Sequence, residues 1–274
     1  MLAAAVTYLF TAATGPTLFA QHATQQPVSP PSDDIVVEGL RDLDDPASAV
    51  THSTLGSGRT GGGARRSQQA FDLASRFAAC AIKPGADTRL LRAALDGTIN
   101  SASQRFAQGR LVQIRSACAQ DPGVARQTGA ATIMTGYDTS YYDRGALLIR
   151  ALALFAPDLR LTKSQTADPT VQARFNTREV RLARFRLPVD RTYSEAAICL
   201  VRLQPELSVR LVKTDDASQI ARLEALIVNG GLACVGNAKR VYFDPSQFRM
   251  YIADAVYRWA VAAKGVDSLI PADA

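Results

Sequence analysis

The stretch SQQAFDLASRFAACA, residues 67–81, sets the pattern on which the fold is built. Its apolar residues recur at steps of three and four, which places them on one face of a helix: Ala70, Leu73, Ala74, Phe77, Ala78 and Ala81. Pro84-Gly85 follows and ends the pattern, because proline has no backbone N–H to continue a helix. The stretch therefore predicts an amphipathic helix that carries Cys80 near its end.

Three further helices are expected downstream. A short one runs from Asp87 to Asp96 and ends at Gly97, and a longer one runs from about Ser101 to Cys118. Asp143 is positioned to N-cap a fourth, which is apolar along one face and ends before Pro157. Residues 67–156 are thus predicted to form a small unit of about four helices.

The same order of features returns between residues 191 and 264. Four short matches recur in sequence: Ala78-Ala79-Cys80 with Ala197-Ile198-Cys199, Ser101-Ala102-Ser103-Gln104 with Asp216-Ala217-Ser218-Gln219, Ala117-Cys118 with Ala233-Cys234, and Tyr141-Tyr142-Asp143 with Tyr242-Phe243-Asp244. Ser or Asp followed three residues later by Gln is a capping-box signature, and Asp244-Pro245 resembles an N-cap followed by proline at the first helical position. We therefore predict a duplicated helical unit, with residues 265–274 as a tail.

The repeat selects one pairing for the four cysteines. Four cysteines allow three pairings, and the repeat predicts Cys80 with Cys118 and Cys199 with Cys234. Disulfides that close loops of this size would stabilise the fold by about 3 to 4 kcal/mol each in the chain-entropy model. Zinc is the rival explanation, but no C-x-x-C occurs and the thiols fall into two distant pairs. In a reducing compartment they would instead be four small buried apolar side chains.

The first 66 residues differ in character from the rest. Residues 1–20 are mostly apolar and small and resemble a signal peptide, which predicts a periplasmic or secreted protein with no transmembrane span in the mature chain. Residues 21–66 are rich in Pro, Ser and Gly and are predicted to be a disordered linker. A G-x-G-x-x-G pattern at Gly56, Gly58 and Gly61 has no strand before it or βαβ context, which argues against a nucleotide site.

Composition bounds the class and the function. The chain is 47% hydrophobic and only 7% aromatic, which favours an all-α fold. Its net charge is +6, but the sequence lacks the dense basic clusters of a nucleic-acid binder. The two histidines, His22 and His52, precede the helical region, so triads and histidine-ligated metals within it are excluded. No catalytic, metal or cofactor-binding residue is predicted. A carboxylate-dependent enzyme, for example a carbohydrate-active one, stays as the alternative: Asp143, Asp215, Asp216, Asp244 and Asp254 are its candidates, although most of them are expected to be caps and Asp254 to lie on a polar helix face.

The connector at residues 157–190 is the best candidate for an interaction surface. It carries seven basic residues against four acidic ones. If the segment is helical, Arg174, Arg178 and Arg181 share a face, with Arg184 nearby. These arginines are predicted to contact an envelope protein or an anionic surface. An ordinary solvated helix face is the alternative.

Two resemblances add to this. Asp34-Ile35-Val36-Val37-Glu38-Gly39-Leu40-Arg41 resembles the segment that opens the plug of TonB-dependent outer-membrane receptors. Together with the Pro/Ser-rich leader, the paired cysteines and a final helix that begins at Tyr242-Phe243-Asp244-Pro245, it makes the chain similar to uncharacterised exported proteins of alphaproteobacteria. That resemblance implies export and a helical fold, and it assigns no activity and no site.

Overall fold

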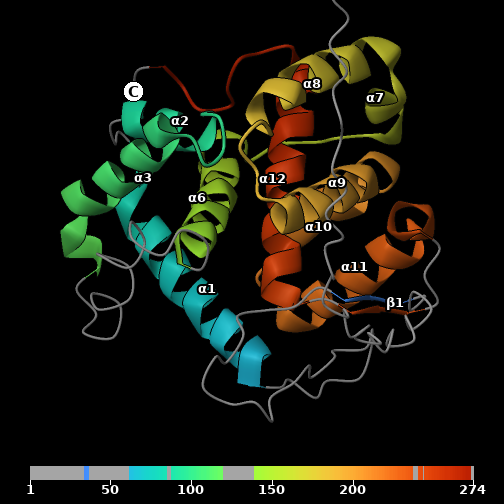
Figure 1. Cartoon of the computed structure of the whole chain (residues 1–274), viewed down its shortest axis with the longest axis horizontal. Coiled ribbons are helices and arrows are strands. Elements are labelled where there is room, and N and C mark those ends of the chain that lie inside the picture. The colour runs from blue at the N-terminus through green and yellow to red at the C-terminus, as the bar shows by residue number, and fades with distance from the viewer. Residues whose placement is uncertain are drawn as a thin grey trace, which may run out of the picture. The chain divides into compact units, whose positions relative to one another are not determined.

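Regular structure in the computed structural model is almost entirely helical, as predicted (Figure 1). The structure describes residues 34–36, 62–84, 88–119, 139–236, 240–242 and 244–272. The predicted signal peptide, residues 1–20, lies outside them. None of the helices in these ranges is long and apolar enough to cross a bilayer.

The predicted four-helix units appear as two runs of elements in the same order. The first run is α1 (Gly62–Ala81), α2 (Arg89–Leu95), α3 (Ala102–Ile114), the 3₁₀ helix η1 (Ser116–Ala119) and α6 (Thr139–Phe155). The second is α9 (Pro188–Leu203), α10 (Pro205–Lys213), α11 (Ala217–Asn229), the 3₁₀ helix η2 (Leu232–Val235) and α12 (Pro245–Lys264). Between them lie α7 (Lys163–Ala167) and α8 (Pro169–Leu182).

Most predicted N-caps are confirmed. The Asp244 carboxylate accepts a hydrogen bond from Gln247 N at 2.9 Å, and Pro245 is the first residue of α12. Asp216 and Ser101 cap α11 and α3 in the same way. The prediction that Asp143 is an N-cap is wrong, because α6 begins four residues earlier, at Thr139, and Asp143 lies inside the helix.

Packing follows the same plan in the two runs. The first helix of each run packs on the last, α1 on α6 and α9 on α12, while α2 pairs with α3 and α10 with α11. The two last helices, α6 and α12, pack on each other, and Gly145 lies against the Met250 side chain where they meet. This shared plan agrees with the sequence repeat, whose origin by duplication stays a prediction.

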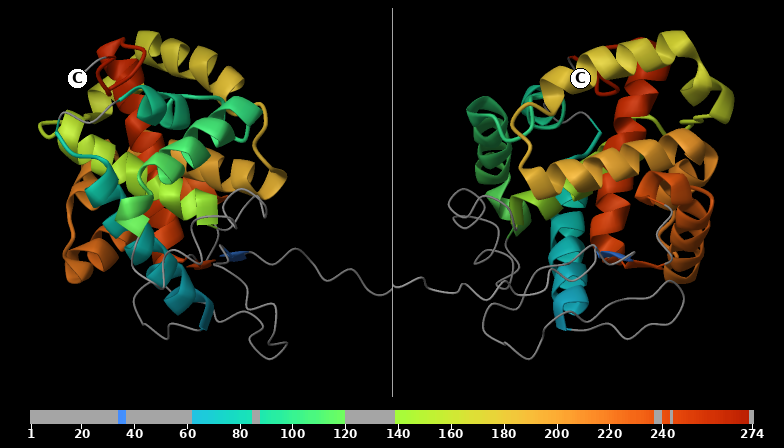
Figure 2. Two further views of the ribbon diagram at one scale, coloured as in Figure 1. Left: turned by 90° about the vertical axis from the view of Figure 1, so that its left-hand side faces the viewer. Right: turned by 45° about the vertical axis from the view of Figure 1, so that its right-hand side comes forward.

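Helix α12 lies at the centre of the core. Every residue from Ser246 to Ala262 is buried, and α12 contacts α1, α6, α8, α9 and α10 (Figure 2). Asp254 is therefore buried, and its predicted place on a polar face is wrong, because this helix has neighbours on all sides. One hydrophobic cluster contains residues of both runs, and the described residues that follow position 33 form a single compact unit.

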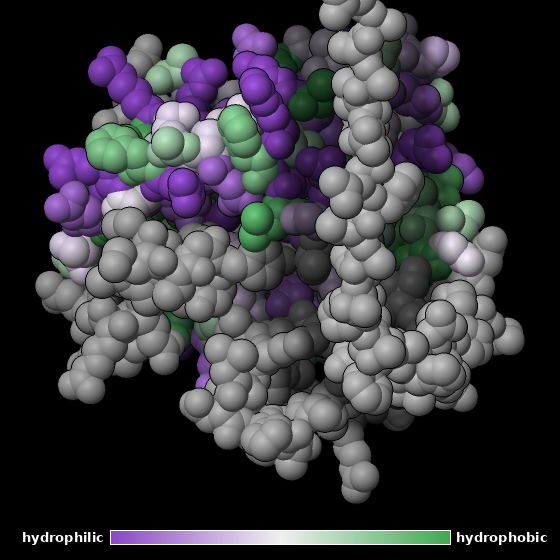
Figure 3. All heavy atoms as spheres, in the orientation of Figure 1, coloured by the Kyte–Doolittle hydropathy of each residue, from purple (hydrophilic) through white to green (hydrophobic). Residues whose placement is uncertain are grey.

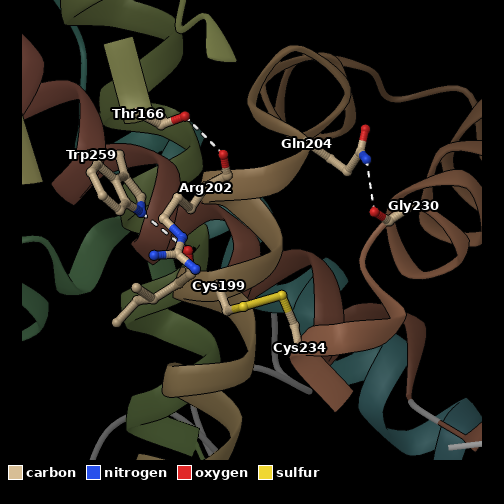
Figure 4. The surroundings of a disulfide bond; sticks show 8 residues. Thr166, Cys199, Arg202, Gln204, Gly230, Cys234 and Trp259 are labelled. Carbon is tan, nitrogen blue, oxygen red and sulfur yellow. Dashed lines mark hydrogen bonds between the residues drawn. A yellow bond between two sulfur atoms is a disulfide. The ribbon is translucent and has the colours of Figure 1, made fainter. Parts of the chain in front are cut away.

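Both predicted disulfides are present. Cys80 of α1 is bonded to Cys118 of η1, and Cys199 of α9 to Cys234 of η2. Figure 4 shows the second bond beside Trp259, whose indole N–H donates to the Ile198 carbonyl at 3.2 Å. Each bond thus joins the first helix of a run to the 3₁₀ turn that follows its third helix.

Two parts of the predicted linker, residues 21–66, have regular structure. Helix α1 begins at Gly62, before the predicted start at residue 67. Strand β1 (Asp34–Val36) pairs in parallel with β2 (Arg240–Tyr242), with Ile35 opposite Val241. Residues 34–36 and 62–66 of the predicted linker thus have regular structure, and its other residues lie outside the described ranges.

Candidate interaction surface

The predicted basic connector, residues 157–190, contains α7, α8 and the first residues of α9. Helix α8 starts where Asp168 accepts hydrogen bonds from Thr170 N and Val171 N, with Pro169 as its first residue. It ends at Leu182, and Pro188 opens α9 after a short connection. The helical conformation assumed for Arg174, Arg178 and Arg181 is confirmed, and Arg184 follows the helix end.

One face of α8 is docked on the core. Val171, Phe175 and Leu182 are buried, and the Phe175 ring stacks on Trp259 of α12 with centroids 4.1 Å apart. Because Val180 and Arg181 lie on other sides of the helix, they remain exposed. The helix therefore presents a fixed outer face.

The four arginines predicted to contact a partner differ in exposure. Arg178 is half-buried and forms an ion pair with Asp96 at 3.1 Å. Arg174, Arg181 and Arg184 are exposed. The structure thus assigns Arg178 to a link between α8 and the end of α2 and leaves the other three side chains at the surface.

The acidic residues between positions 174 and 191 are bonded to the interior. Residues 174–191 contain two carboxylates, Glu179 and Asp190. Glu179 pairs with the buried Arg258, while Asp190 is 3% exposed and accepts from Arg186 at 2.9 Å and from the Tyr251 hydroxyl at 3.0 Å. The exposed charged side chains of residues 174–191 are all arginines: Arg174, Arg181, Arg184 and Arg191.

A buried ion network lies beneath the segment. The Asp254 carboxylate pairs with Arg186 at 2.6 Å, Arg144 at 3.0 Å and Arg258 at 3.1 Å. Burial alone would raise the pKa of Asp254, but the three guanidinium groups outweigh burial and hold that pKa well below its ordinary value. Arg186 was counted among the connector's basic residues; in the structure it anchors the α8–α9 connection to the central helix.

Apolar side chains are exposed between the surface arginines of residues 174–191. Val180 is 80% exposed, Phe185 49% and Leu187 47%. Figure 3 shows apolar side chains (green) set singly among hydrophilic ones (purple) over α3 and the α8–α9 connection. We call the exposed apolar and arginine side chains of residues 180–191 the basic apolar face: Val180, Arg181, Arg184, Phe185, Leu187 and Arg191.

The candidate carboxylates of the alternative enzyme hypothesis have structural roles or lie apart. Asp216 caps α11, Asp215 is exposed and pairs with Arg249, and Asp254 is held in the buried ion network. Asp244 caps α12 and accepts from the buried Ser67 hydroxyl at 2.7 Å. Asp143 is buried, which raises its pKa to about 7, and its Oδ2 atom has no hydrogen-bond partner among the residues that the structure describes.

Two buried carboxyls, Asp190 and Glu224, are not among the carboxylates that the sequence singled out. Glu224 of α11 is 3% exposed, and burial followed by the negative charge of Asp244 raises its pKa to about 8. Its spacing from Ile227 and Val228, three and four residues on, places it on the apolar face of α11 and was the available signal. Within the ranges that the structure describes, no three His, Cys, Asp or Glu side chains are grouped so as to hold a metal ion.

Comparisons with family models, curated proteins and solved structures found no match for this chain. The basic apolar face therefore stands on its own geometry. It combines outward arginines, inward carboxylates and exposed apolar side chains on a segment anchored to the core.

Proposed function

We propose that this protein is a non-catalytic exported envelope protein that binds an anionic surface through the basic apolar face. The observation that carries the proposal is the separation of charge in residues 174–191. Both carboxylates of that stretch are bonded inside the molecule, whereas four of its arginines are exposed, three of them on the basic apolar face. A ligand at this surface meets positive charge without a neighbouring acidic side chain from the same stretch.

Arginine suits such a role for physical reasons. Its guanidinium stays charged at all physiological pH values and matches the geometry of phosphate, sulfate and carboxylate groups. Several such groups together attract an extended anionic surface, and salt screens that attraction over about 8 to 10 Å. Binding through this face should therefore weaken steeply as the ionic strength rises.

Export is supported by the cysteines and by the character of the N-terminus. Disulfides persist in oxidising compartments, and the four cysteines form two of them. The apolar stretch at residues 1–20 supplies an export signal in this proposal. The duplicated helical unit acts as a scaffold that holds α8 and the α8–α9 connection in place.

Binding to dextran sulfate, a soluble sulfated polymer, tests the proposal. The double variant Arg181→Glu/Arg184→Glu should lose binding, since it reverses two exposed charges of the face. The matched control is Arg210→Glu/Arg222→Glu, which reverses two exposed arginines on α10 and α11 and changes the net charge equally. Equal losses in the two variants would show that only net charge matters and would contradict a specific face.

A further inference from the structure

We infer that the anionic surface is a phospholipid bilayer, into whose interface the face inserts Phe185 and Leu187. This inference rests on the proposed function and goes further, because a charged polymer needs only the arginines. The apolar side chains carry the additional step. Phe185 and Leu187 lie two residues apart and are each about half exposed, while Arg186 between them is buried.

The two apolar side chains are flanked by charge on either side. Arg181 and Arg184 precede them and Arg191 follows, and all three are exposed. Amphipathic helices that lie in the interface of anionic membranes combine Phe and Leu with Lys and Arg, and the α8–α9 connection brings the same residue types together at the surface. In that arrangement the apolar groups reach the acyl boundary while the guanidinium groups stay among the phosphates.

The Arg184 side chain already has the geometry that this requires. Its guanidinium carbon lies 5.3 Å from the centroid of the Phe185 ring. The ring face therefore stabilises the cation, and charge and ring are presented side by side. A headgroup phosphate bound by Arg184 would bring the Phe185 ring to the depth of the interface.

The segment is held in place before it meets a membrane. The Leu182 carbonyl accepts from Ile99 N at 3.1 Å, and the Phe185 carbonyl accepts from the Asn100 side chain at 3.3 Å. Arg186 anchors the same connection to Asp254 and Asp190. Little backbone conformational entropy is therefore lost when the face docks, which favours binding through only a few side chains.

Flotation with lipid vesicles tests the inference. Vesicles of phosphatidylcholine with phosphatidylglycerol should bind the protein, and vesicles of phosphatidylcholine alone should not. Phe185→Ser/Leu187→Ser should lower partitioning into the anionic vesicles by about tenfold or more, as expected for lost burial of two apolar side chains. Leu226→Ser/Leu232→Ser is the matched control, with exposed leucines at 43% and 41% on α11 and η2, and should partition like the parent.

The outcomes separate this inference from the proposed function. Anionic vesicle binding that survives Phe185→Ser/Leu187→Ser contradicts insertion, while the loss of dextran sulfate binding in Arg181→Glu/Arg184→Glu would still support the proposed function. Binding to dextran sulfate without binding to vesicles assigns the face to a soluble polymer and overturns the lipid inference. Binding to neither ligand overturns both.

Fluorescence gives a second readout that does not depend on affinity alone. Trp259, the single tryptophan of the chain, is buried, so a tryptophan placed by Phe185→Trp would report on the surface. Its emission should shift to shorter wavelength on anionic vesicles and be quenched by brominated acyl chains. An unchanged spectrum with bound vesicles would contradict insertion.

Discussion

The Nη2 atom of Arg186 lies 2.6 Å from Oδ2 of Asp254, which joins the α8–α9 connection to the centre of the core. The same carboxylate also forms ion pairs with Arg144 and Arg258. A charged side chain on the central helix thus holds the segment that carries the basic apolar face. Stability and the proposed binding are linked through this pair.

Asp254→Asn should lower the free energy of unfolding by about 3 to 5 kcal/mol, because the buried Arg144 loses the carboxylate that it pairs with, and Arg186 and Arg258 each lose one of two. Denaturant unfolding monitored by circular dichroism measures this. Asp215→Asn is the control: its carboxylate pairs with Arg249 but is 96% exposed, so a change below about 1 kcal/mol is expected. Similar losses in the two variants would contradict a dominant role for the buried ion network.

The buried carboxyls Asp143 and Glu224 should make the fold less stable as the pH rises. Their folded-state pKa values are raised to about 7 and about 8 by burial. The stability that their neutral forms give the fold is therefore complete below their unfolded pKa values, which lie near 4. The stabilisation is lost as the pH rises through the folded pKa values, at up to about 1.4 kcal/mol per pH unit for each group. Asp143→Asn/Glu224→Gln should flatten the stability curve between pH 5 and 9, measured by denaturant unfolding. A slope equal to that of the parent protein would count against buried neutral carboxyls.

Gly145 should be intolerant of a larger residue where α6 meets α12. A Cβ atom at this position would overlap Met250 from its Cβ to its sulfur, so Gly145→Ala should destabilise by about 1 to 3 kcal/mol despite the higher helix propensity of alanine. In a double-mutant cycle, Gly145→Ala should cost less when Met250→Ala has made room. Additive effects in thermal or denaturant unfolding would mean that the two helices are not this close.

The disulfide between Cys199 and Cys234 should contribute about 3 to 4 kcal/mol, the value expected for a loop of this length. Cys199→Ser/Cys234→Ser should lower the free energy of unfolding by that amount and leave the Cys80–Cys118 bond intact. Peptide mapping under non-reducing conditions checks the pairing. A Cys80–Cys199 or Cys118–Cys234 peptide would contradict the predicted pairing.

Local features of the fold were predictable from the sequence. The caps at Ser101, Asp216 and Asp244 depend on residues within one turn, and the cysteine pairs followed from the repeat. The prediction that Asp143 caps α6 is wrong because the helix begins one turn earlier, at Thr139.

Features that depend on distant contacts were not predictable. An amphipathic pattern assumes solvent on one side, whereas Asp254 belongs to a helix enclosed on all sides. Helical spacing placed Arg178 and Arg181 together, but the partner of Arg178 is Asp96, which is distant in the chain. The basic character of the connector was predicted, while the inward orientation of Glu179 and Asp190 and the exposure of Phe185 required the packed structure.

Vesicle flotation of the parent protein beside Arg181→Glu/Arg184→Glu and Arg210→Glu/Arg222→Glu tests the central claim most directly. We predict salt-sensitive binding to phosphatidylglycerol-containing vesicles that persists in the α10–α11 variant and is lost in the Arg181/Arg184 variant. Retained binding in the Arg181/Arg184 variant, with the fold intact by circular dichroism, would contradict the assignment of this face.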